Sequence, residues 1–91
     1  MKRFEYKVPG GKLLCAKVKT DENKISFIQF TGDFFLLPET DLEDLENQLI
    51  GANIDTEKIT EKIVDFFNTR KTVIAGAKPE DFAHVLNNAL K

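Results

Sequence analysis

The chain has 91 residues, with no tryptophan, one cysteine and one histidine. A single cysteine excludes an internal disulfide and any zinc site built on several cysteine ligands, and a lone thiol fits a reducing compartment. The longest apolar runs, such as residues 34–37, fall far short of the roughly 20 residues needed to span a bilayer. No apolar segment follows the basic first residues, so we expect no secretion signal, a cytoplasmic location and no membrane partner.

An excess of positive charge is also lacking. Thirteen Lys and Arg against fifteen Asp and Glu give a formal net charge of −2, which provides no general attraction to nucleic acid, and we expect no nucleic-acid partner. Basic residues are concentrated in residues 1–20 and acidic residues in 21–65. This uneven distribution fits either a solvated sheet face, which we favour, or a patch that steers a partner.

Apolar residues are sufficient for a core, since 42% of the chain is hydrophobic and eight residues are phenylalanine. The length predicts a single domain over residues 1–91 with little surplus buried surface. A deep active site would be hard to house in such a small domain. The size therefore favours a binding or accessory role over a self-contained enzyme.

The N-terminal part has the pattern of a β-hairpin. Residues 3–8 and 12–19 alternate between apolar and polar side chains, which predicts two half-buried strands. Between them, Pro9, Gly10 and Gly11 predict a tight turn, because proline presets φ and glycine accepts a positive φ.

A third strand is predicted over residues 24–31, with apolar side chains on both of its faces. Ile25 and Phe27 would point one way, and Ile28 and Phe30 the other. Either both faces are covered, or a β-bulge near Phe27 shifts the register.

The remainder is predicted to be mostly helical. Residues 34–37 are expected to form a short fourth strand at the sheet edge, and a capping box from Thr40 opens a first helix that closes at Gly51. A second helix begins near Asp55, residues 70–78 are expected to be a loop, and Pro79 begins a third helix. Strands followed by helices predict an α+β fold, an antiparallel sheet of three to four strands with about three helices packed on one face.

Known catalytic motifs are missing: no phosphate-binding loop, dinucleotide fingerprint or zinc-protease motif occurs. His84 falls beside the apolar stripe of the third helix, which favours a boundary position over a catalytic one. Cys15 lies in mid-strand, and we interpret it as an inert small hydrophobe, although Lys17 on the same face could stabilise a thiolate. The acidic residues of 39–46 could suggest a metal site, but a solvated helix start is the better account.

Two segments are more distinctive. The turn at Pro9–Gly11 lies between Lys7 and Lys12, and it could either present backbone N–H groups to an anion or form a simple hairpin. In the second segment, Phe34 and Phe35 should face opposite ways, one in the core and the other exposed or covered by a partner. The candidate contact residues are therefore Lys7, Pro9, Gly10, Gly11, Lys12, Gly32, Asp33, Phe34 and Phe35.

Residues 7–13 and 31–35, in this order and spacing, resemble the C-terminal accessory domain of lipoate–protein ligases. Two later features agree with the resemblance: the acidic, leucine-spaced helix that ends in Leu49-Ile50-Gly51, and Pro79-Glu80-Asp81-Phe82 at the start of the last helix. The resemblance extends over nearly the whole chain. It implies a sheet-plus-helices fold akin to that of sulfur-transfer scaffold proteins.

The resemblance also implies a function. Since the chain begins almost at the accessory domain, it resembles the separately encoded small subunit of a bipartite ligase, which forms a heterodimer with a catalytic subunit. In that family the catalytic subunit joins lipoate to ATP, with Mg, to give lipoyl-adenylate, and then transfers lipoyl to a lysine of an acceptor domain. The accessory domain is needed for the activation step. The family's nucleotide and lipoate motifs are absent here, so we expect no catalysis and no strong binding of ATP or lipoate by this chain alone.

A physical role follows as a hypothesis: Lys7 and Lys12 would supply positive charge near the leaving pyrophosphate, and Phe34 or Phe35 would anchor the interface. Two other functions stay open, a sulfur-transfer or cluster-assembly scaffold, which needs an exposed reactive thiol, and a general protein-interaction module. A lipoyl carrier is disfavoured, because no Asp-Lys-Ala-like tripeptide occurs.

Overall fold

The computed structural model describes all residues, 1–91, and has the predicted α+β class. Its elements, in chain order, are β1 (Lys2–Val8), β2 (Lys12–Asp21), β3 (Lys24–Gly32), β4 (Phe35–Leu37), α1 (Thr40–Leu49), α2 (Thr56–Arg70), β5 (Val73–Ala75) and α3 (Pro79–Ala89).

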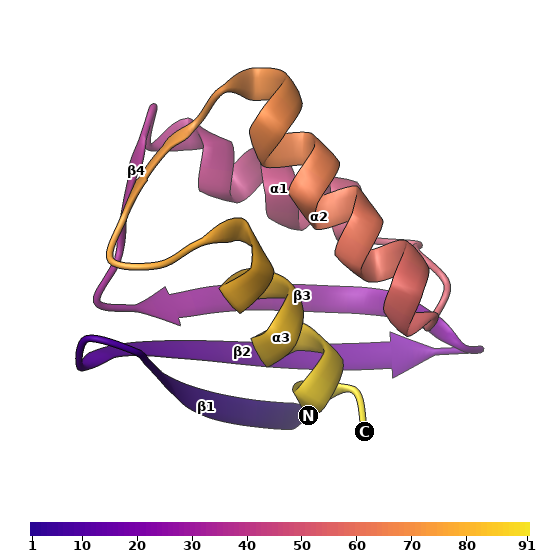
Figure 1. Cartoon of the computed structure of the whole chain (residues 1–91). Coiled ribbons are helices and arrows are strands. Elements are labelled where there is room, and N and C mark those ends of the chain that lie inside the picture. The colour runs from indigo at the N-terminus through magenta and orange to yellow at the C-terminus, as the bar shows by residue number, and fades with distance from the viewer.

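The main sheet is antiparallel, with the strand order β1-β2-β3. All three helices lie on one side of it, and its other face is uncovered (Figure 1). This arrangement confirms the predicted packing of helices on a single face. None of the helices is both long and apolar enough to cross a membrane.

The β1–β2 hairpin has the predicted turn. Val8 pairs with Lys12 at the end of the ladder, and the N–H of Gly11 donates to the carbonyl oxygen of Val8 at 3.0 Å. Gly10 has the positive φ, +107°, that the second central position of such a turn needs. Glycine at this position therefore fits the turn without strain.

A β-bulge in β3 decides between the two alternatives for this strand. The register shifts between Lys19 and Thr20, which leaves Ser26 as the extra residue. As a result Ile25 is buried under the helices, 1% exposed, whereas Phe27 lies on the uncovered face and is 37% exposed. The bulge near Phe27 is confirmed, and the alternative in which both faces are covered is wrong.

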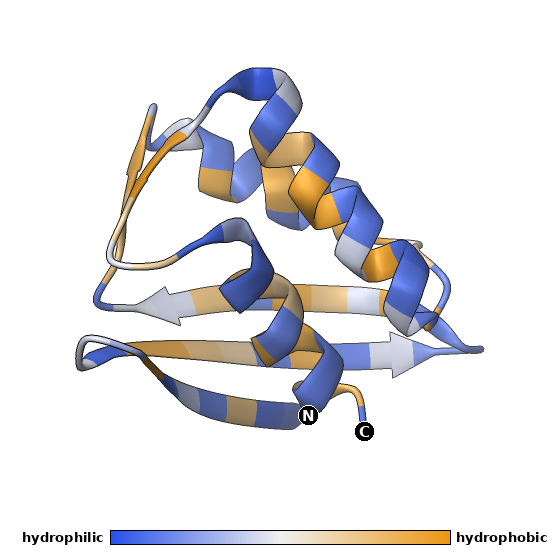
Figure 2. Ribbon diagram, in the orientation of Figure 1, coloured by the Kyte–Doolittle hydropathy of each residue, from blue (hydrophilic) through white to orange (hydrophobic).

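The core lies between the sheet and the helices, and Phe82 of α3 is at its centre. The Phe82 ring is fully buried, and the rings of Phe30, Phe34 and Phe67 lie around it at centroid distances of 5.1–5.3 Å. These are ordinary edge-to-face and tilted aromatic contacts. Figure 2 shows the apolar stripes of the helices turned toward the sheet.

The prediction for residues 34–37 and 70–78 needs correction. Strand β4 does not join the main sheet as a fourth strand; it pairs antiparallel with β5, inside the segment expected to be a loop, and the two form a separate two-stranded sheet. An apolar run of three residues carries no periodicity that separates a strand from a loop. Only pairing between segments far apart in sequence creates this sheet.

The start of α1 also differs from the prediction. Glu39 is the N-cap residue and makes no side-chain cap, so the capping box at Thr40 is wrong. Asp41 is not solvated: it is 4% exposed and accepts hydrogen bonds from Arg70, at 3.2 Å, and from the hydroxyl of Thr72. The start of α1 is therefore held by hydrogen bonds that Asp41 accepts from residues about 30 positions further along the chain, and not by a local side-chain cap.

The other helix boundaries agree with the sequence. Asp55 caps α2 by accepting from the N–H of Lys58 at 3.1 Å, and Pro79 is the first residue of α3. Gly51 follows the end of α1 in a left-handed conformation, with φ +85°.

Candidate functional site: the hairpin end

The two distinctive segments of the sequence lie together at one end of the molecule. The side chain of Lys12 and the segment Gly32–Phe35 line one open hollow with Ala75 and Gly76. We call the β1–β2 turn, residues 32–35 and residues 75–78 the hairpin end. The structure thus brings together most of the candidate residues, and it adds a third segment that the sequence did not single out.

Close backbone contact holds residues 32–35 against the hairpin. The N–H of Asp33 donates to the carbonyl oxygen of Leu13 at 2.8 Å. A Cβ atom at Gly32 would lie only 2.1 Å from that same oxygen. Only glycine fits at this crossing, which explains physically why a glycine precedes Asp33.

Gly76 makes an equivalent contact on the other side of the same segment. A Cβ atom there would lie 2.6 Å from the carbonyl oxygen of Asp33 and 3.2 Å from the Cα of Phe34. The three segments of the hairpin end are therefore stacked backbone against backbone. A cluster held in this way is pre-organised rather than formed on binding.

A second hollow, of about 420 Å³, lies beside the first and contains two lysines. Lys12 lines both hollows, and Lys78 contributes to the second one together with Pro9 and Gly10. The Asp81 carboxylate in this hollow accepts the N–H of Lys78 at 2.8 Å, so it is held by the start of α3. Lys78 is not among the candidate contact residues predicted from the sequence. The only sequence feature that indicates this position is that Lys78 directly precedes Pro79, at the start of the third helix.

Lys7 is separated from these residues. It pairs with Leu13 in the β1–β2 ladder, whereas Lys12 pairs with Val8. Because side chains alternate across a sheet, Lys7 lies on the uncovered face and Lys12 on the side that carries the helices. The two predicted lysines therefore cannot act on the same group from the same side.

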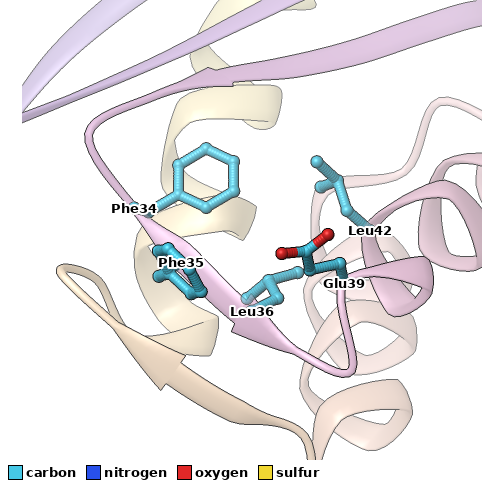
Figure 3. Close-up of a pocket in the computed structure, with 5 residues that line it drawn as sticks. All are labelled: Phe34, Phe35, Leu36, Glu39 and Leu42. Carbon is cyan, nitrogen blue, oxygen red and sulfur yellow. The ribbon is translucent and has the colours of Figure 1, made fainter.

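Phe34 and Phe35 divide as expected. The Phe34 ring packs edge-on against Phe82 at 5.1 Å, and Phe35 is 57% exposed. Figure 3 shows both rings at the edge of a further hollow near the start of α1.

The remaining nucleophile and base do not line either hollow of the hairpin end. Cys15 is 4% exposed, and its Sγ accepts the Nε–H of Arg3 at 3.3 Å, which also raises the pKa of Arg3. A buried thiol of this kind does not suit sulfur transfer. His84 is exposed on α3 with its ring 4.4 Å from that of Tyr6. No three His, Cys, Asp or Glu side chains are grouped so that they could hold a metal ion.

Comparison with known proteins identifies the family to which this fold and its hairpin end belong. Residues 2–86 match the family described as the C-terminus of bacterial lipoate protein ligase. This chain belongs to that family. The match includes the whole hairpin end.

Two matches to this chain come from Thermoplasma acidophilum. One, named lipoate-protein ligase A subunit 2, is 39% identical over 74 residues, which cover 81% of this chain and 76% of the relative. A chain from a solved structure has a TM-score of 0.75 and 36% identity, and the match covers 93% of this chain and 90% of that one. That structure is described as an archaeal lipoylation system, a bi-partite lipoate protein ligase and its E2 lipoyl domain.

Proposed function

We propose that this chain is the accessory subunit of a bipartite lipoate–protein ligase and is required, with its catalytic subunit, for the activation of lipoate. The observation that carries the proposal is the 39% identity to a ligase subunit 2, supported by a fold shared over nearly the full length with a chain from the structure of a bi-partite ligase and its lipoyl domain. In this proposal the chain has no catalytic activity of its own.

The reaction assigned to the complex has two steps. In the first, a lipoate carboxylate oxygen attacks the α-phosphorus of ATP, and pyrophosphate leaves. In the second, the amine of an acceptor lysine attacks the lipoyl carbonyl carbon, and AMP leaves. Charge builds up on the departing pyrophosphate in the first step, so fixed cations beside it lower the barrier.

The hairpin end is suited to assist the first step. Lys12 and Lys78 both line one hollow, and the close backbone contacts at Gly32 and Gly76 hold the neighbouring segments in place. Docked at the mouth of a catalytic subunit, they would face a polyphosphate and help to exclude water. We assign ATP, magnesium and lipoate to the catalytic subunit, because the hollows of this chain are open rather than enclosed.

The test is lipoate-dependent exchange between ATP and pyrophosphate, measured with the matching catalytic subunit, with this chain alone and with both together. We expect strong exchange only with both. Equal exchange by the catalytic subunit with and without this chain would overturn the proposed function. Exchange by this chain alone would overturn its assignment as non-catalytic.

A further inference from the structure

The small sheet formed by β4 and β5 carries an apolar outer face. Phe35 pairs with Ala75 and Leu37 pairs with Val73, so these four side chains point the same way. We call them the apolar ribbon face. Phe35, Leu37 and Val73 are 57%, 52% and 60% exposed. Both strands are visible as an orange ribbon beside α1 in Figure 2.

The outward positions of β1 show what a solvated strand of this chain looks like. Arg3, Glu5 and Lys7 alternate with the inward Phe4 and Tyr6, so every outward side chain is charged. Antiparallel sheets with one wet face normally have this pattern. The apolar ribbon face breaks it, since all of its outward side chains are apolar. Single exposed apolar residues are common, but a contiguous group of this kind marks an interaction surface.

The inner side of the small sheet is firmly supported. Leu36 is 4% exposed, and Ile74 and Phe34 pack against the main core. A two-stranded sheet is marginal by itself, but here the core fixes it from below. The apolar ribbon face is therefore held in one conformation before any partner arrives, which reduces the entropy cost of binding.

A hollow of about 190 Å³ borders this face. Its walls are the apolar side chains of Phe34, Phe35, Leu36 and Leu42, and the Glu39 carboxylate lies among them (Figure 3). Apolar walls with one carboxylate suit the aliphatic stem and the cationic end of a lysine or arginine.

We propose that the apolar ribbon face is the docking surface for the catalytic subunit, and that a basic side chain of that subunit occupies the hollow beside Glu39. This inference rests on the proposed function. Phe35 and Ala75 also line the hollow that contains Lys12, so the docking surface is continuous with the hairpin end. A catalytic subunit seated here meets Lys12 at the edge of the interface, which is the position that a role in activation requires.

The experiment compares two sets of exposed substitutions. The test variant is Phe35→Thr/Leu37→Thr/Val73→Thr, and threonine is chosen because it favours strands. The matched control, Leu13→Thr/Phe27→Thr, alters the two exposed apolar residues on the uncovered face of the main sheet, which are 40% and 37% exposed. Circular dichroism and urea unfolding verify that each variant is folded, and calorimetry measures its affinity for the purified catalytic subunit.

We expect the test variant to bind at least about 30-fold more weakly, as loss of central apolar anchors does at other interfaces, and the control to bind like the wild type. Glu39→Arg should weaken binding by about tenfold through repulsion of the basic side chain. Wild-type affinity of a folded test variant, or a large loss in the control, would overturn the docking surface. Unchanged affinity of Glu39→Arg for the catalytic subunit would show that no basic side chain of that subunit occupies the hollow beside Glu39.

Two further results separate this inference from others. Light scattering should give the mass of a monomer for the isolated chain. If the wild type is instead a dimer and the test variant is a monomer, the apolar ribbon face binds a second copy of this chain, and the proposal is overturned. If the wild-type chain stimulates exchange and the test variant stimulates it equally at limiting concentration, the docking surface is wrong and the proposed function stands. If the wild-type chain neither binds nor stimulates, the proposed function itself fails.

Discussion

The Cα of Gly76 lies so close to the carbonyl oxygen of Asp33 that a Cβ atom would be 2.6 Å from it. This contact joins the segment between β5 and α3 to the segment between β3 and β4. Both segments line the hollow that contains Lys12. The shape of the hairpin end therefore depends on a residue without a side chain.

We predict that Gly76→Ala destabilises the protein more than Gly51→Ala does. The two glycines have similar φ, +94° and +85°, but nothing lies within 4 Å of a Cβ atom at Gly51. Gly51→Ala should cost about 1–2 kcal/mol of backbone strain alone. Gly76→Ala should cost about 1–3 kcal/mol more, because the backbone must also move apart. Urea unfolding measures both, and equal losses would show that the contact with Asp33 is not tight.

The distance along the chain over which a feature is determined explains what the sequence could and could not predict. The Pro9–Gly11 turn is confirmed because proline and glycine limit φ locally. The bulge in β3 is one of the two alternatives that the sequence predicts, because a change of face in a period-two pattern is also local. Strand β5 and the place of Lys78 depend on contacts across more than 35 residues, which no local pattern encodes.

Asp41 provides a second prediction. Its buried carboxylate accepts from Arg70 and Thr72, and so joins the start of α1 to the end of α2 and the loop that follows it. Asp41→Ala should lower the free energy of unfolding by about 1–3 kcal/mol, because it leaves the half-buried hydroxyl of Thr72 without its acceptor and removes one of the two carboxylates that bind Arg70.

The matched control for Asp41→Ala is Asp44→Ala. Asp44 binds the same Nη1 of Arg70 at 2.8 Å, but its side chain is 45% exposed. Exposed ion pairs contribute little, so the loss should be clearly smaller. Equal losses in urea unfolding would contradict the structural role of Asp41. Sequence reasoning missed this role because acidic residues in a first helical turn also suit the helix dipole.

Glu46 gives a prediction about pH. Burial raises the pKa of its carboxyl group, and the nearby charge of Glu43 adds to the rise. The N–H of Phe30, which donates to this carboxylate at 2.8 Å, partly opposes the rise. A raised pKa in the folded state means that ionisation of Glu46 disfavours folding. Its contribution to stability is therefore complete below the unfolded pKa of about 4.3 and is lost as the pH rises through the folded value.

Glu46→Gln keeps an oxygen that can accept from Phe30 but carries no charge. We therefore expect the stability of Glu46→Gln relative to the wild type to increase between pH 4 and pH 7, as measured by urea unfolding at each pH. Glu61→Gln, at an exposed position on α2, controls for the general loss of a negative charge. A relative stability that falls with rising pH would contradict a raised pKa.

The last prediction concerns the lysines of the hairpin end. Lys12→Ala/Lys78→Ala removes both ammonium groups of the second hollow, and Lys7→Ala/Lys17→Ala removes two from the uncovered face of the main sheet. The net charge changes equally in both variants, so general electrostatic attraction falls by a similar amount. In the complex, the first variant should slow lipoate-dependent ATP–pyrophosphate exchange by about tenfold at saturating subunit, since fixed cations stabilise the charge that develops on pyrophosphate. The second should retain wild-type exchange. If both variants slow exchange equally, the lysines act only through net charge; if neither does, the hairpin end does not contact the leaving group.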